Sequence, residues 1–327
     1  MLLLTKAVFA IMIGFLSSTV LGLFLIPLLK KIHLGQKISV FVGEAHRKKE
    51  GTPTMGGLIF IVPTVVSTLA LIITDKVSYT SNLGIVLLVF IGYACIGFLD
   101  DFLSVRKGDN EGLTVYQKLI MQVLIAIGFF YIYMRSGGQT AWVVGTLGID
   151  LELGWLYGLA ILFVLVGASN AVNLTDGIDG LDASVTTVVV CFFIMASGYL
   201  GFRLNSIFAC SAAGAIIGFY MWNAHPAKVF MGDTGSLFLG GLVVSLAFGI
   251  GRPILLIFTG IIYLIEALSV MLQVVYYKKT KKRLFKMSPI HHHFELCGWN
   301  EEKIDVVFSL VTVVGCIIAF LSILLRW

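Results

Sequence analysis

The sequence predicts an all-α integral membrane protein with about ten transmembrane helices. Of its 327 residues, 58% are hydrophobic and only 13% are charged, which is about half the charged fraction of a water-soluble chain. The mean hydropathy is +0.97. Since a membrane-spanning helix needs about 20 apolar residues, this length leaves little room for a separate soluble domain. We therefore expect one polytopic membrane domain over residues 1–327.

Apolar runs long enough to be helices follow one another along the whole chain. In order, the predicted spans are Leu2–Leu29, Met55–Thr74, Leu83–Leu99, Leu119–Met134, Trp155–Asn170, Ala183–Leu200, Ile207–Met221, Leu237–Gly249, Pro253–Tyr277 and Val306–Leu325. The first run is too long for a secretory signal, so we expect it to be retained as a helix. The five cysteines form no CxxC pair, so neither a disulfide framework nor a zinc site is expected.

Lysine and arginine are distributed unevenly between the two sets of loops. Most of the 23 basic residues follow odd-numbered spans, including the runs His46–Lys49 and Lys278–Arg283. The exceptions are Lys6, Lys76, Arg135, Arg203, Arg252 and Arg326. The positive-inside rule therefore places the loops after odd-numbered spans in the cytoplasm and both termini outside.

Every unusual polar cluster falls on this predicted cytoplasmic side. The segments are "KKEGTPTMGG" (48–57), "GFLDDF" (97–102), "NAVNLTDGIDGLDAS" (170–184), "NAHPAKVFMGDTGS" (223–236) and "SPIHHHFE" (288–295). Carboxylates with few soft ligands nearby favour Mg²⁺, which shares its coordination shell with water and phosphate oxygens. The sequence therefore predicts a site for a hard cation and phosphates, built from five loops at the inner membrane surface.

The acidic residues each have a functional and a purely structural interpretation. Adjacent residues on a helix point about 100° apart, so Asp100 and Asp101 cannot both face lipid comfortably, and we favour a function for the pair. Glycines around Asp233 predict a turn that opens a helix, where we favour a cation ligand over an N-cap. Asp182 is expected to be an N-cap or a supporting group. Glu266 lies inside an apolar run, where both a functional acid and a packed structural pair fit.

The five motifs together resemble those of the bacterial phospho-N-acetylmuramoyl-pentapeptide transferases. The matching segments are "GTPTMGG", "GFLDDF", "NAVNLTDGIDGLDA", "VFMGDTGS" and "PIHHHFE", in the same order and over essentially the whole chain. The resemblance implies transfer from UDP-N-acetylmuramoyl-pentapeptide to undecaprenyl phosphate, with UMP and the first lipid-linked peptidoglycan precursor as products. It also implies a Mg²⁺ requirement, a homodimer in the bacterial cytoplasmic membrane, and no nucleic-acid partner.

The same resemblance assigns roles to individual residues. Asp100 and Asp101 match the family's catalytic pair, and Asp233 matches its magnesium-binding catalytic aspartate. The residues that match its uridine pocket are Asp176, Gly177, Ile178, Asp179 and Phe230. Those expected around the nucleotide and the sugar are Lys49, Thr54, Lys118, Asn173, Asn223, Gln273, His292 and His293. Isoleucine at 178, where leucine is common, should preserve an apolar wall.

The chemistry of the residues agrees with this reading. Attack by a lipid phosphate on the β-phosphate of a UDP-sugar gathers negative charges, which a cation at Asp233 would stabilise. A carboxylate at 176 or 179 can accept the uracil N3–H or a ribose hydroxyl, and Phe230 can stack on the base. Direct attack and an aspartyl-phosphate intermediate both remain open, and we favour direct attack because a phosphate is already an adequate nucleophile.

Two other functions are compatible with parts of the sequence. A polyprenyl-phosphate N-acetylglucosamine-1-phosphate transferase shares the acidic motifs, but "HHHFE" favours the muramoyl-pentapeptide branch. An ion-coupled transporter would also have about ten helices and membrane carboxylates. Such a protein should carry ionisable residues near the middle of the bilayer, and here only Glu266 qualifies.

Overall fold

The chain folds into a series of long helices with one short β-hairpin. The computed structural model describes residues 3–32, 51–74, 81–107, 112–138, 140–144 and 149–325. Its long helices are α1 (Leu3–Lys31), α3 (Leu58–Thr74), α4 (Ser81–Lys107), α5 (Val115–Arg135), α6 (Tyr157–Thr175), α7 (Leu181–Leu200), α8 (Arg203–Asn223), α9 (Gly232–Gly249), α11 (Ile261–Thr280) and α13 (Glu301–Leu324). The shorter helical elements are η2 (Gly154–Leu156), η3 (Pro253–Leu255), α10 (Leu256–Thr259) and α12 (Ile290–Glu295).

The helices correspond to the ten predicted spans. Within the described residues, nine helices are long and apolar enough to cross a membrane, and Leu58–Ala70 of α3 forms a shorter apolar helix. The predicted span Pro253–Tyr277 is wrong in one respect, because it is not one continuous helix. The chain passes through η3 and α10 and restarts as α11 after Gly260.

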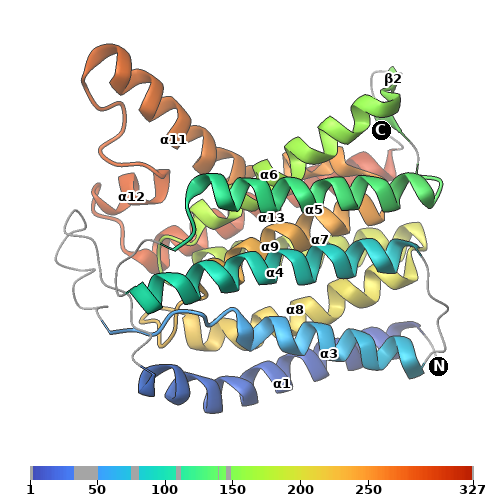
Figure 1. The fold of residues 1–327 in the computed structure, drawn as a ribbon, viewed down its shortest axis with the longest axis horizontal. Coiled ribbons are helices and arrows are strands. Elements are labelled where there is room, and N and C mark those ends of the chain that lie inside the picture. The colour runs from blue at the N-terminus through green and yellow to red at the C-terminus, as the bar shows by residue number, and fades with distance from the viewer. Residues whose placement is uncertain are drawn as a thin grey trace.

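Two short strands, which the all-α prediction did not include, connect α5 to α6. Strands β1 (Ala141–Val144) and β2 (Ile149–Glu152) pair antiparallel, with Ala141 opposite Glu152. The hairpin lies at the same end of the molecule as the N- and C-terminal ends of the chain (Figure 1). Termini that share one end agree with an even number of spans.

Helix α9 lies at the centre of the helical array. It packs against α4 and α6, and nearly all of its side chains are buried. Most of the other long helices run in roughly the same direction, whereas α11 leans away from the rest at the end opposite to the termini, and the start of α6 leans away at the end near β2 (Figure 1). The end of α4 and the starts of α5 and α9 meet at this second end, together with α12.

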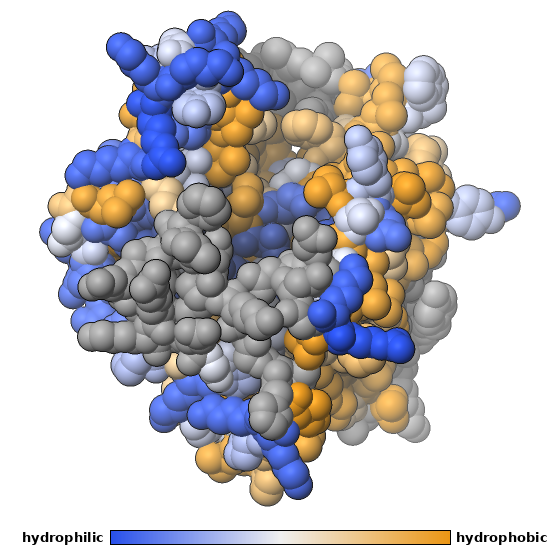
Figure 2. All heavy atoms as spheres, turned by 60° about the vertical axis from the view of Figure 1, so that its left-hand side comes forward, coloured by the Kyte–Doolittle hydropathy of each residue, from blue (hydrophilic) through white to orange (hydrophobic). Residues whose placement is uncertain are grey.

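Side-chain polarity distinguishes this second end from the flanks. Hydrophilic residues gather on it, whereas the surface that runs back along the helices is largely hydrophobic (Figure 2). Apolar side chains stay exposed along α1, α5, α11 and α13, as expected of helices that face lipid. The polar end is where the predicted site residues collect.

Candidate active site

A glycine turn places Asp233 in the first turn of α9. Gly232 has φ +69°, in the left-handed region, and an added Cβ there would lie 2.4 Å from Oδ2 of Asp101. Only glycine therefore fits between α9 and α4 at this position. The N-cap of α9 is Met231, so Asp233 is not the cap, and its carboxylate is directed toward other side chains.

The carboxylate of Asp101 accepts hydrogen bonds from the first turn of α9. Helix α4 continues to Lys107, so Asp100 and Asp101 lie within its last turns rather than at its end. The buried carboxylate of Asp101 accepts hydrogen bonds from the Asp233 N–H at 3.2 Å, the Thr234 N–H at 2.9 Å and the Thr234 hydroxyl at 2.6 Å. These bonds satisfy N–H groups that have no partner inside the helix. Asp101 thus holds α9, and with it Asp233, against α4.

Lys118, from the first turn of α5, bridges the other two carboxylates. Its Nζ lies 2.6 Å from Oδ2 of Asp233 and 3.0 Å from Oδ2 of Asp100. On the opposite oxygen, Asp233 accepts a 2.9 Å hydrogen bond from Nδ2 of Asn173. The Leu113 N–H donates to Oδ1 of Asp100 at 2.7 Å, which fixes the loop before α5. Three segments, namely α5, α6 and the loop before α5, therefore hold the two carboxylates.

This acidic cluster fits a hard divalent cation. Asp100, Asp101 and Asp233 each offer a carboxylate oxygen, and these oxygens lie within 4.8 Å of one another. The ammonium group of Lys118 already lies between two of them, so positive charge is stabilised here. An all-oxygen donor set of this kind suits Mg²⁺ rather than a metal that prefers nitrogen or sulfur.

The segment before α3 pairs with the segment before α9. The Phe230 N–H donates to the Pro53 carbonyl at 2.9 Å, and the N–H groups of Gly56 and Gly57 donate to the carbonyls of Phe230 and Met231. Thr54 is buried against this pairing, and its hydroxyl has no hydrogen-bond partner among the described residues. Phe230 remains partly exposed, three residues before Asp233. Lys49 lies outside the described residues.

The loop Asp176–Gly180 follows α6 and carries four predicted uridine contacts. Ile178 is buried in the main apolar core, consistent with an apolar wall. Although the Asp176 side chain keeps some exposure, its burial and the negative charges of Asp182 and Asp233 raise its pKa well above the usual range. Gly177 packs against His291, whose Nε2 would lie 2.1 Å from a Cβ at 177.

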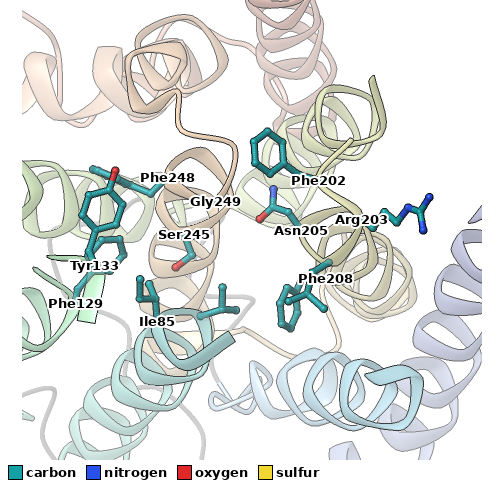
Figure 3. A pocket seen from close by; sticks show the side chains of 12 residues that line it. Ile85, Phe129, Tyr133, Phe202, Arg203, Asn205, Phe208, Ser245, Phe248 and Gly249 are labelled. Atoms are coloured by element: carbon teal, nitrogen blue, oxygen red, sulfur yellow. The ribbon is translucent and has the colours of Figure 1, made fainter. Parts of the chain in front are cut away.

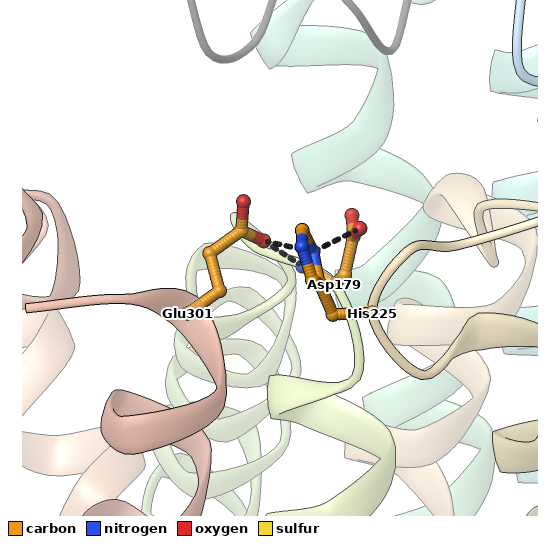
Figure 4. Close-up of side chains that lie close together, drawn as sticks. All are labelled: Asp179, His225 and Glu301. Carbon is orange, nitrogen blue, oxygen red and sulfur yellow. Dashed lines mark hydrogen bonds and ion pairs between the residues drawn. The ribbon is translucent and has the colours of Figure 1, made fainter.

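Asp179 is the most firmly held residue of this loop (Figure 4). Its N–H donates to Oε2 of Glu301 at 2.9 Å, and its carboxylate accepts from the Ala227 N–H and from Nδ1 of His225, both at 3.0 Å. Asn223 adds a further link, because its amide accepts from the Gly180 N–H and donates to the Val229 carbonyl. Sequence reasoning missed His225 and Glu301. The only signal was their position in polar loops on the predicted cytoplasmic side.

The expectation that Asp182 caps a helix is wrong. Helix α7 begins after Gly180, whose φ of +81° ends the preceding loop, so Asp182 lies one residue inside the helix. Its side chain is fully buried and accepts a 3.1 Å hydrogen bond from Thr186, while Oδ2 has no hydrogen-bond partner in the described chain. Its hydrogen bond with Thr186 is therefore made within α7.

Glu266 is a structural pair rather than an isolated acid. It is fully buried in α11 and accepts hydrogen bonds from the Ile290 N–H at 2.8 Å and from Nδ1 of His291 at 3.1 Å. It therefore anchors α12, which carries the three histidines, to α11. His292 contacts Glu295, His293 accepts from the Lys286 N–H, and Gln273 accepts from the N–H groups of Leu284 and Phe285.

A separate pocket lies away from these residues. Its volume is about 270 Å³, and it opens between α4, α5, α8 and α9 at the termini of these helices that are remote from the acidic cluster (Figure 3). Phe129, Phe208 and Phe248 line it, with Asn205 and Ser245 as polar groups. It contains none of the predicted site residues, so the acidic cluster is the better candidate for chemistry.

The array of membrane helices and its acidic end can now be compared with known proteins. Residues 83–250, which include nearly all of α4, all of α9 and the chain between them, match the model of glycosyl transferase family 4. The fold and the site thus define a polytopic membrane transferase of that class.

The match extends to a narrower group. Residues 49–61 match signature 1 of the phospho-N-acetylmuramoyl-pentapeptide-transferases. Proteins of that name are similar over 97% of this chain, with 47% identity in Clostridium perfringens, 44% in Clostridium novyi and 45% in Geobacillus sp., and the alignments cover 97%, 97% and 96% of those relatives. The chain belongs to the phospho-N-acetylmuramoyl-pentapeptide-transferase family and is an enzyme.

Proposed function

We propose that this enzyme transfers phospho-N-acetylmuramoyl-pentapeptide from its UDP conjugate to undecaprenyl phosphate at the cytoplasmic face of the membrane. The observation that carries the proposal is that Lys118 forms ion pairs with both Asp100 and Asp233. This cluster lies at the polar end of the bundle, beside the loops predicted to bind uridine. A soluble donor and a membrane-borne acceptor can meet only at such an interface. The products are UMP and the first lipid-linked peptidoglycan precursor.

The reaction exchanges one phosphate bond for another. An oxygen of undecaprenyl phosphate bonds to the β-phosphorus of the donor, the bond from that phosphorus to the UMP oxygen breaks, and its electron pair leaves with UMP. In this proposal the attack is direct, with no aspartyl-phosphate. A bound Mg²⁺ supplies positive charge that stabilises the charge developing on the departing UMP.

The carboxylates divide the work according to their contacts. Asp233, which Asn173 and Lys118 orient, would hold the Mg²⁺ ion. Asp100 lies nearer the acceptor and orients or deprotonates its phosphate, and Lys118 adds positive charge toward the phosphates. Asp101 positions Asp233, because its carboxylate is occupied by the first turn of α9.

The surrounding loops recognise the donor. Asp176, Gly177, Ile178, Asp179 and Phe230 form the uridine pocket in this proposal. The residues around the nucleotide and the sugar are Lys49, Thr54, Asn173, Asn223, Gln273, His292 and His293. The buried hydroxyl of Thr54 supports this role, because it has no hydrogen-bond partner among the described residues and a polar group of the bound UDP substrate could provide one.

The proposal includes the setting of the enzyme. The distribution of basic residues supports an active site that faces the cytoplasm and termini on the outer side. We also propose that the chain acts as one membrane domain and as a homodimer. A transporter is disfavoured because the buried acid Glu266 is engaged by Ile290 and His291.

The test compares two donors on purified protein. UMP release from UDP-N-acetylmuramoyl-pentapeptide should require both undecaprenyl phosphate and Mg²⁺, and chelation by EDTA should stop it. UDP-N-acetylglucosamine in place of the muramoyl donor should give little UMP. Equal or better turnover with the N-acetylglucosamine donor would contradict the proposed substrate.

A further inference from the structure

Two segments that are distant in the sequence converge on one residue of the uridine loop. Asp179 belongs to the loop after α6, His225 and Ala227 to the connection between α8 and α9, and Glu301 to the first turn of α13. The Asp179 side chain is 1% exposed, whereas that of His225 is 40% exposed. In the hydrogen-bonded cluster of Asp179, His225 and Glu301, the side chain of His225 is therefore the most accessible.

The hydrogen-bond partner of His225 fixes the role of its Nδ1 atom. A carboxylate accepts hydrogen bonds, so the Nδ1 that lies 3.0 Å from Oδ2 of Asp179 carries the hydrogen. The same nitrogen lies 3.8 Å from Oε2 of Glu301, which places the imidazole between two carboxylates (Figure 4). Without the imidazole, the carboxylates of Asp179 and Glu301 would face each other. Of its two hydrogen bonds described above, Oδ2 of Asp179 would keep the one from the Ala227 N–H.

We infer that His225 is a positioning residue for nucleotide recognition, which it serves by holding Asp179 and hence the Asp176–Gly180 loop. The inference rests on the proposed function, in which this loop binds uridine. His225 and Glu301 act on opposite sides of Asp179, since Glu301 accepts from its backbone and His225 donates to its side chain. The loop geometry then depends on His225, although His225 needs no contact with the nucleotide.

Three substitutions at 225 separate this role from a general structural one. The amide nitrogen of His225→Asn can reach the place of Nδ1, whereas that of His225→Gln reaches farther, toward the place of Nε2. His225→Ala has no donor. We expect the alanine and glutamine variants to weaken UMP binding and to raise the KM for the UDP donor about tenfold, since a hydrogen bond to a charged group is lost. The asparagine variant should stay close to wild type.

Other kinetic constants limit the interpretation. In the alanine and glutamine variants, kcat and the KM for undecaprenyl phosphate should not change, because the acidic cluster is untouched. Lys303→Ala is the control, since Lys303 follows Glu301 by two residues on α13 but contacts the ring of Trp299. Glutamine that restores binding as well as asparagine, or a fall in kcat with unchanged UMP affinity, would overturn the inference.

A double-mutant cycle tests whether His225 acts through Asp179. In an Asp179→Ala background, His225→Ala should cause no further loss of UMP affinity, measured by isothermal titration. Losses that multiply would contradict the inference. If wild-type protein bound no UMP, or if Asp179→Ala bound it normally, the proposed uridine site would fail instead, so the two failures are distinguishable.

Discussion

Replacing Asp101 by asparagine changes the acceptor that holds the first turn of α9. Three donors meet this carboxylate, namely the Asp233 and Thr234 N–H groups at 3.2 and 2.9 Å and the Thr234 hydroxyl at 2.6 Å. An amide keeps one acceptor oxygen and puts an NH₂ group where the other oxygen stood. The new NH₂ group then faces at least one of the three hydrogen-bond donors of α9, and the negative charge beside the N-terminus of α9 is lost.

The expected cost follows from these contacts. Losing a hydrogen bond to a charged acceptor costs about 1.5–3 kcal/mol, and this figure already includes the charge that the two N–H groups face. We expect Asp101→Asn to lower the free energy of unfolding by about 1.5–3 kcal/mol. Because the same bonds orient Asp233, the Mg²⁺ concentration for half-maximal activity should rise, and saturating Mg²⁺ should restore part of the turnover.

Thermal unfolding in detergent and Mg²⁺ titration of UMP release measure the two effects. Asp100→Asn is the matched control, because the Asp100 carboxylate binds Lys118 and the Leu113 N–H rather than the backbone of α9. Its melting midpoint should fall less than that of Asp101→Asn. An Asp101→Asn enzyme that melts like wild type, and whose lost turnover no Mg²⁺ concentration restores, would refute the positioning role and place Asp101 at the reacting atoms.

Four further substitutions test other parts of the site. Asp233→Asn should leave a folded protein with almost no UMP release, and near-normal turnover at ordinary Mg²⁺ would contradict its role as cation ligand. Phe230→Ala should remove stacking on the base and weaken UMP and UDP-donor binding by about 1–3 kcal/mol without changing undecaprenyl phosphate affinity, and unchanged UMP inhibition would place the base elsewhere. Since the Asp176 pKa is raised, the ionised form of Asp176 opposes folding at neutral pH, so Asp176→Asn should raise the melting midpoint at pH 7 in EDTA. The gain should shrink as the pH falls from that raised pKa toward the usual pKa of an aspartate, and a lower midpoint at every pH would contradict this. A Cβ at Gly97 would lie 2.1 Å from the Asp233 carbonyl oxygen, so Gly97→Ala should cost about 1–3 kcal/mol and lose activity, whereas Gly167→Ala, which meets nothing within 4 Å, should melt like wild type.

Local sequence patterns were sufficient for the helices and for the end of the bundle that carries the site. Apolar runs mark the membrane helices because hydrophobicity is a property of each segment alone. The break at Gly260 was missed because Pro253–Tyr277 reads as one apolar run despite Glu266. Asp182 was misread as a cap because the residue that precedes α7, Gly180, depends on a left-handed backbone angle that composition does not reveal.

Residue contacts across the bundle could not be predicted in the same way. The motifs indicated that Asp100, Asp101 and Asp233 act together, but not that Asp101 binds the backbone of α9. Lys118 was expected near the nucleotide, and its bridge between Asp100 and Asp233 depends on how α5 packs beside α4. The links from Asp179 to His225 and Glu301 join three loops, and no spacing within one segment encodes them.

The partnership between Asp101 and α9 has a consequence for biosynthesis. The residues are 132 positions apart, so α4 leaves the ribosome long before the helix that it will hold. A nascent chain that ends before Asp233 has none of the three donors that Asp101 has in the finished protein. Insertion of α9 is therefore the step at which the buried charge becomes satisfied, and chains arrested before it should be preferred targets of membrane quality-control proteases that recognise unpaired polar groups.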